Sequence, residues 1–185
     1  GRPNGASSCQ NPVQGKAGSW LFGCLPRFTK GEDRGSHALE VRRAMIQNFT
    51  ELSTKKVLQA LEMAVAELAG LRQNLLTPDF ILVALLSQPD AEPLRILGNL
   101  LSNPGEAAER ITGRVRQHYQ RAAPVQANQI VATQEVAELF RLAYEEAKQL
   151  GDAYISTGTL FIALFDPKLG HTAELLRQEG INQDQ

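Results

Sequence analysis

The chain has 185 residues, of which 43% are hydrophobic, and a formal net charge of −1 at neutral pH. This near-neutral balance, without a long run of like charges, argues against a nucleic-acid-binding surface. No stretch reaches the roughly 18 apolar residues that a membrane-spanning helix needs. We therefore expect a soluble, cytoplasmic protein, or one of an organelle's stroma or matrix, with neither nucleic acid nor membrane as a partner.

Residues 1–35 are rich in glycine, serine, proline and asparagine and show no helical or alternating pattern. Both cysteines, Cys9 and Cys24, lie in this stretch, without the spacing or the histidine partners of a zinc site. We predict a flexible or linker segment; the alternative is that its apolar patch, residues 20–28, docks on a groove. Residues 36–185 are expected to form one domain, beginning with a short helix after Ser36.

Four helices are predicted in the first part of this domain. A long helix should follow Thr54, because apolar residues then recur with the spacing of one helical face. Thr77 and Pro78 should begin a short helix whose run, residues 80–86, is apolar nearly all round and therefore central to the core. A third helix should follow Asp90, and a fourth should begin at Asn103 and Pro104. The apolar positions of the long helix are Val57, Leu61, Ala64, Leu68 and Leu71.

The same pattern returns 79 residues later. Thr133 should cap a second long helix, Ser156 or Thr157 should begin a second short helix, and a third helix should run from about His171 to Glu179, with Gly180 as its stop. The repeated apolar face consists of Val136, Phe140, Ala143, Ala147 and Leu150.

This repeat predicts an all-α fold, a tandem pseudo-repeat of a four-helix unit, and no alternating strand pattern of useful length is present. Repeat one should cover about residues 50–121 and repeat two about residues 130–185. The counterpart of the fourth helix would begin where the chain stops, so the last helix is missing. Together with a first residue, Gly1, that is not methionine, this suggests a piece of a longer polypeptide.

Candidates for catalysis are absent from the sequence. The three histidines, His37, His118 and His171, have no ligand-like spacing from a second ligand and are expected to be exposed near helix ends. No phosphate-binding glycine loop and no nucleophile motif is present. We therefore predict that the chain is not an enzyme and holds no metal and no cofactor.

The turn after the second long helix, residues 151–157, carries an acid, an aromatic residue and two cap hydroxyls. One interpretation is structural: Asp152 hydrogen-bonds the loop backbone while Tyr154 and Ile155 pack inward. The other is functional: the turn lines the boundary between the repeats, which we call the seam, where a ligand peptide could lie. The two interpretations are compatible.

These turns resemble the N-terminal domain of the Clp ATPases, the hexameric unfoldases of the ClpB and ClpC type. Residues 151–156, Gly-Asp-Ala-Tyr-Ile-Ser, match the family pattern G-[DH]-x-[FY]-I-[GS], and the proline after Thr77 is similar to the ClpB form. The resemblance covers roughly residues 50–182. It implies a tandem repeat of a four-helix unit that binds unfolded or aggregated protein segments, or adaptor proteins, above an ATPase ring.

The resemblance also implies site residues. A threonine that opens the repeat and an acid in the second turn, here Thr54 and Asp152, would handle substrate, whereas the family's glutamate is replaced by Gly158. The expected binding residues are Thr54, Asp152, Tyr154, Thr77, Phe80 and Gly158.

Three functions remain open at this stage. The first is the substrate- or adaptor-binding domain of a Clp-type chaperone, with ATP and magnesium bound by downstream modules. The second is a stand-alone Clp-repeat protein that docks on Clp ring subunits or a Clp protease and aids assembly. The third is a sensor that binds a small ligand in the seam.

Overall fold

The computed structural model describes residues 48–89, 92–125 and 129–181. Residues 1–35, the helix expected after Ser36 up to residue 47, the cap expected at Asp90 and the last four residues lie outside this described part. The described part begins in a helical stretch, residues 48–51.

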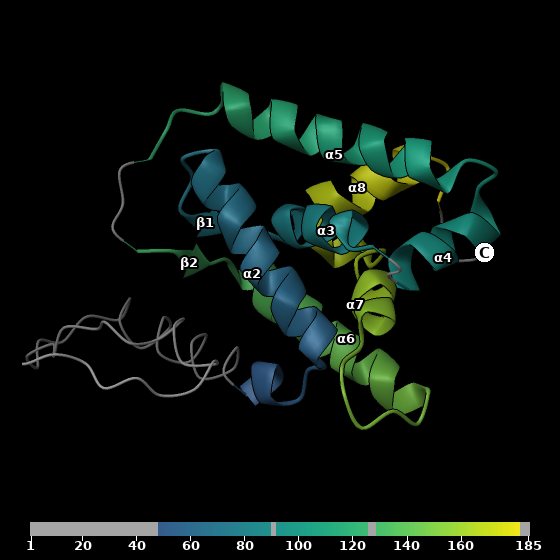
Figure 1. The fold of residues 1–185 in the computed structure, drawn as a ribbon. Coiled ribbons are helices and arrows are strands. Elements are labelled where there is room, and N and C mark those ends of the chain that lie inside the picture. The colour runs from purple at the N-terminus through teal and green to yellow at the C-terminus, as the bar shows by residue number, and fades with distance from the viewer. Residues whose placement is uncertain (1–47, 90–91, 126–128, 182–185) are drawn as a thin grey trace, which may run out of the picture. The chain divides into compact units, whose positions relative to one another are not determined.

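The described chain is mostly helical, as predicted, and the order of its elements repeats (Figure 1). The fourth helix, α5, has no counterpart among the described residues. Repeat one contains α2 (Lys55–Gly70), β1 (Leu75–Leu76), α3 (Pro78–Ser87), α4 (Glu92–Leu100) and α5 (Pro104–Arg121). Repeat two contains β2 (Val131–Ala132), α6 (Gln134–Gln149), α7 (Thr157–Ala163), the 3-10 turn η1 (Pro167–Leu169) and α8 (His171–Gln178).

The residues at which the described helices were predicted to begin are confirmed, but most of the expected side-chain caps are not formed. Ser156 does cap α7: its hydroxyl accepts from the Thr159 backbone N–H at 3.1 Å, and the Thr159 hydroxyl accepts from the Ser156 N–H at 2.9 Å. Thr54 and Thr133 precede α2 and α6 in extended conformation and make no side-chain cap. Their backbone N–H groups are instead bonded to the opposite repeat, as described below.

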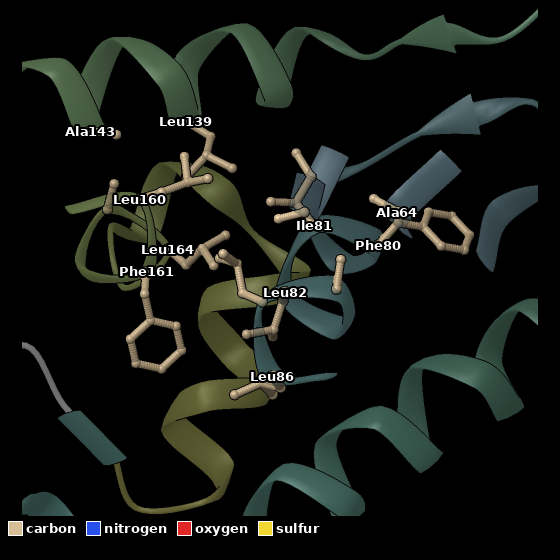
Figure 2. Close-up of a cluster of buried hydrophobic side chains, with 14 of the residues drawn as sticks. Ala64, Phe80, Ile81, Leu82, Leu86, Leu139, Ala143, Leu160, Phe161 and Leu164 are labelled. Atoms are coloured by element: carbon tan, nitrogen blue, oxygen red, sulfur yellow. The ribbon is translucent and has the colours of Figure 1, made fainter. Parts of the chain in front are cut away.

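The core is centred on α3, which packs against α2, α5, α7 and α8 (Figure 1). Every residue from Pro78 to Leu86 is buried, and for residues 80–86 the apolar sequence predicted this. The neighbouring side chains come from both repeats (Figure 2). Burial of one such leucine or phenylalanine contributes about 1.5–3 kcal/mol to folding. The two repeats therefore share one core, which Figure 2 illustrates with Ala64, Phe80, Ile81, Leu82, Leu86, Leu139, Ala143, Leu160, Phe161 and Leu164.

Both long helices end in the same left-handed turn. Arg72 and Gly151, which are 79 residues apart in sequence, have φ angles of +54° and +78°. The next N–H groups bond back to the helix: Gln73 N–H donates to the Leu68 carbonyl at 3.1 Å, and Asp152 N–H donates to the Ala147 carbonyl at 2.8 Å. This pattern is the Schellman motif, for which glycine is the preferred residue.

The repeated apolar register holds along the long helices and fails at its last position. The first four residues of each apolar face are buried. At the fifth position, Leu71 is half-buried, whereas Leu150 is 63% exposed. The expectation that Leu150 lies on the buried face is therefore wrong: both residues follow the end of their helix, but Leu71 packs against the core and Leu150 does not.

Candidate functional site

The two repeats exchange backbone hydrogen bonds across the seam. Leu75 and Leu76 pair in parallel with Val131 and Ala132, and Ser53 forms the equivalent single bridge with Ile155. The Thr133 N–H donates to the Leu76 carbonyl at 3.0 Å, and 79 residues earlier the Thr54 N–H donates to the Ile155 carbonyl at 2.9 Å. The chain before each long helix therefore pairs with the chain after the other long helix. Pairings of two residues are too short for a sequence pattern to predict.

This exchange brings Thr54 next to the turn that contains Asp152 and Tyr154. Ile155 is fully buried and its N–H donates to the Leu52 carbonyl at 2.7 Å. Tyr154 is 57% exposed, so the expectation that it packs inward is wrong. The alternation of side chains in an extended segment explains the difference, because buried Ile155 places its neighbour on the opposite face.

The Asp152 carboxylate makes no hydrogen bond within the described part of the chain, and its backbone N–H serves the end of α6. The interpretation in which this carboxylate braces the loop is therefore not supported. Asp152 and Tyr154 both present exposed side chains beside Thr54.

The equivalent turn in repeat one also exposes a large apolar side chain. Leu75, which is 79 residues before Tyr154, is 50% exposed. Val125 and Ile130 are also exposed, and the Val125 N–H bonds to the Arg72 carbonyl at 2.9 Å, close to the same turn. The seam is thus marked by apolar surface at two equivalent places.

Thr77 and Phe80, at the start of α3, lie behind the surface. The Thr77 hydroxyl is 2.9 Å from the Tyr119 phenol oxygen, and the Phe80 ring packs against the Tyr119 ring with centroids 4.5 Å apart. Phe80 is fully buried, so it supports the site and does not present a contact surface.

Between them, Asp79 forms the most connected polar group in this region. Its buried carboxylate accepts a hydrogen bond from the Tyr119 phenol at 3.0 Å and from the Thr172 hydroxyl at 2.5 Å, and it lies 2.8 Å from His171 Nδ1. Burial, reinforced by the negative charge of Asp79, raises the pKa of Tyr119 well above its usual value. The phenol therefore remains a proton donor at physiological pH.

The sequence did not reveal this cluster. His171 was expected to be exposed near a helix end, and its side chain is indeed 46% exposed, but its contact with a carboxylate was not expected. Asp79 and His171 are brought together by the packing of α3 against α8. The one available signal was an acid directly after the proline that begins an apolar helix, and this signal is equally typical of an acid that only complements the helix dipole.

Gly158 lies at the start of α7, the position equivalent to Asp79. Its N–H donates to Glu92 Oε2 at 2.8 Å, and the Thr157 hydroxyl donates to the same oxygen at 3.2 Å. A Cβ atom at Gly158 would lie 2.8 Å from that oxygen, so glycine is required for this approach. Glu92 on α4 therefore supplies a carboxylate where the sequence has none on α7.

An open hollow of about 440 Å³ lies beside the Asp79 cluster, between the end of α5 and the start of α8. The rings of His118 and His171 are 4.9 Å apart in it. We call it the basic hollow; its lining residues are Arg114, Gln117, His118, Arg121, Ala122, His171 and Leu175.

Among the described residues, no group of three histidine, cysteine or acidic side chains is arranged to hold a metal ion. In that same part of the chain, no helix is long and apolar enough to cross a bilayer.

Comparison with known proteins points to one family. The protein family described as "Clp repeat (R) N-terminal domain" matches residues 52–179 of this chain. The chain is 28% identical over 162 residues to the chloroplastic chaperone protein ClpC1 of Oryza sativa subsp. japonica, covering 86% of this chain and 16% of that protein. It is also 28% identical over 162 residues to the chloroplastic ClpA homolog of Brassica napus, the ATP-binding subunit of an ATP-dependent Clp protease, covering 86% of this chain and 17% of the relative.

Solved structures agree on the fold. The N-terminal domain (1–163) of the ClpV1 ATPase from the E. coli EAEC Sci1 T6SS has a TM-score of 0.62 at 21% identity, covering 82% of this chain and 88% of that one. The N-terminal domain of the ClpD chaperone from Arabidopsis thaliana has a TM-score of 0.51 at 17% identity, covering 72% of this chain and 91% of that one.

Proposed function

Because this chain belongs to the Clp repeat N-terminal domain family, we propose that it is a non-catalytic module that binds protein segments for a Clp-type ATP-dependent unfoldase. Its ligands would be unfolded or aggregated chains, or adaptor proteins. The chain spans 16% and 17% of two curated relatives, so ATP and magnesium chemistry would belong to other modules of such a machine. The names of those relatives make an organelle stroma a location to test beside the cytoplasm.

The observation that carries this proposal is the pair of exposed apolar side chains at equivalent turns, Leu75 and Tyr154. Exposed aromatic and aliphatic side chains beside a repeat boundary are typical of surfaces that bind peptides. An extended or helical apolar segment can bury area there while polar groups at the rim set its orientation.

The predicted binding residues then divide into two groups. Tyr154 would contact the ligand, with Thr54 and Asp152 at the rim of the same turn. Thr77, Phe80 and Gly158 would act indirectly, since they position α3 and α7 through Tyr119 and Glu92.

A binding titration tests this proposal. The 185-residue chain is mixed with a fluorescein-labelled peptide of leucine, serine and glutamine, and anisotropy is recorded. Tyr154→Ser should weaken binding by about tenfold, since loss of a central aromatic contact costs more than 1 kcal/mol. Tyr154→Phe should bind normally. Leu58→Ser, an equivalent change at an exposed position of α2 outside both turns, is the control.

Equal binding by Tyr154→Ser and Leu58→Ser would contradict a role for the turn. Failure of the wild-type chain to bind any apolar peptide, together with recovery of Clp ring subunits in a pull-down, would instead favour the accessory protein that docks on a Clp ring or protease.

A further inference from the structure

We propose that the basic hollow binds a carboxylate-bearing, acidic segment of the protein that this domain recognises. This inference rests on the proposed function, and it adds a preference for acidic residues to the preference for apolar ones. The hollow lies between α5 and α8, and both of its arginines, Arg114 and Arg121, come from α5.

The charges around the hollow are not balanced by the acids near it. Arg114 is already engaged: its guanidinium lies 3.2 Å from Glu179 and donates to Gln178 at 3.2 Å. Glu179, whose side chain is only 4% exposed, also holds Arg110 at 2.9 Å. Arg121 makes no ion pair or hydrogen bond with any described residue. One guanidinium therefore faces solvent with its full capacity for a bidentate bond to a carboxylate.

The other acids of α3 and α8 are also engaged. Asp79 lies behind the hollow and accepts from Tyr119, Thr172 and His171. Glu174 on α8 pairs with Arg177. Neither acid is free to neutralise Arg121, and so an approaching carboxylate meets an uncompensated positive charge.

Two histidine rings also line the hollow. His171 Nδ1 is directed at Asp79, which leaves its Nε2 for another partner. His118 makes ring contacts with Tyr119 and His171 and has no hydrogen bond to another described residue.

The size and lining of the hollow favour a protein segment. A volume of about 440 Å³ is within the range of ordinary ligand pockets and suits one or two side chains. Leu175 and Ala122 supply an apolar lining for the carbon atoms of a glutamate, and the Gln117 amide can bond to backbone. Nucleic acid needs a longer run of positive charge than these few side chains provide.

A pair of matched peptides tests the inference in the 185-residue chain. The first is a fluorescein-labelled peptide of leucine, serine and glutamate, and the second has every glutamate replaced by glutamine. The acidic peptide should bind about fivefold more tightly at low salt, and the difference should shrink as salt is added. Arg121→Gln should remove the preference and leave the affinity for the glutamine peptide unchanged.

The control variant is Arg95→Gln, which removes an exposed arginine of α4 that lies outside the hollow. It should retain the preference, and circular dichroism should show unchanged thermal midpoints for both variants. A preference equally reduced by Arg95→Gln would overturn the inference, because it would reflect net charge alone.

Two further measurements distinguish a protein carboxylate from other anions as the ligand of the hollow. Inorganic phosphate that displaces the acidic peptide at concentrations near the peptide's own Kd, or an oligonucleotide that binds more tightly than it, would overturn the assignment to a protein segment. Equal binding of both peptides would refute this inference but leave the proposed function intact. Failure of both peptides to bind would refute the two together.

Discussion

In repeat one the short helix α3 carries the carboxylate, Asp79, to its junction with α8, whereas in repeat two the short helix α7 carries Gly158 and the carboxylate arrives from Glu92 on α4. The 79-residue offset relates Asp79 to Gly158 and Glu92 to His171. The short helix therefore carries the acid in repeat one, whereas in repeat two the short helix carries the donors. At each of these two junctions, where a short helix meets a neighbouring helix, one carboxylate accepts hydrogen bonds from at least two donors. Either of the two helices can supply the carboxylate.

The comparison explains how repeat two accommodates glycine at the position where repeat one has an acid. Glu92 Oε2 lies within 2.8 Å of the Gly158 N–H, in space that a side chain on residue 158 would need. A carboxylate is thus retained at the start of α7 although residue 158 has no side chain. The two junctions differ in burial, since Asp79 is almost fully enclosed and Glu92 is half-buried.

The largest expected effect is at the buried junction. Asp79→Ala should lower the free energy of unfolding by about 2–4 kcal/mol, because three donors, one of them the fully buried Thr172 hydroxyl, then lose their buried acceptor. Glu92→Ala should cost about 1 kcal/mol, since the Glu92 side chain is half-buried and two donors lose it instead of three. Urea denaturation followed by circular dichroism measures both. Equal losses would contradict the difference in burial between the junctions.

The second effect concerns the close approach at Gly158. Gly158→Ala should destabilise the domain by up to about 1 kcal/mol, because the new methyl group displaces the end of the Glu92 side chain from its hydrogen bonds. Combined with Glu92→Ala it should cost less than the sum of the single changes. Gly113→Ala is the control: it lies within α5 with open space around it and should stabilise by about 0.5–1 kcal/mol.

The third effect distinguishes the two left-handed helix ends. Gly151→Ala should cost about 1 kcal/mol, since a side chain is disfavoured at a φ of +78°. Arg72→Gly should have the opposite sign and stabilise by up to about 1 kcal/mol, because Arg72 already occupies such a conformation. Thermal unfolding of the two variants gives the signs. A loss for both would show that the Arg72 side chain makes a compensating contribution.

The smallest effect concerns α5, which is found in repeat one alone among the described residues. Arg116 joins it to α2 through Glu67, with Nε to Oε1 at 2.6 Å. Arg116→Gln should cost about 0.5 kcal/mol, the usual value for an exposed pair, and the loss should vanish at high salt. A loss above about 2 kcal/mol would place this ion pair among the principal contacts of the domain.

Much of the helical fold could be predicted from the sequence, because each helix carries its own periodicity and start signal. The turn at residues 151–157 could also be singled out from its residue types, but its proximity to Thr54 was seen only in the structure. Contacts between distant segments could not be predicted, since the proximity of Asp79 to His171 depends on how α3 packs against α8. The exposure of Tyr154 was missed because the turn was treated as a unit, whereas side chains in extended chain alternate between two faces.

The reciprocal pairing across the seam has a consequence for how the chain acquires its structure. Residues 52–53 can pair with their backbone partner only when Ile155 is present. This pairing closes a loop of about a hundred residues, which costs chain entropy. A chain that emerges from the ribosome with its N-terminal end first would expose the apolar helix α3 before α6 and α7 exist to cover it. The high sequence separation of these contacts makes folding slower than in a bundle of sequential helices, and neither half is expected to be stable alone.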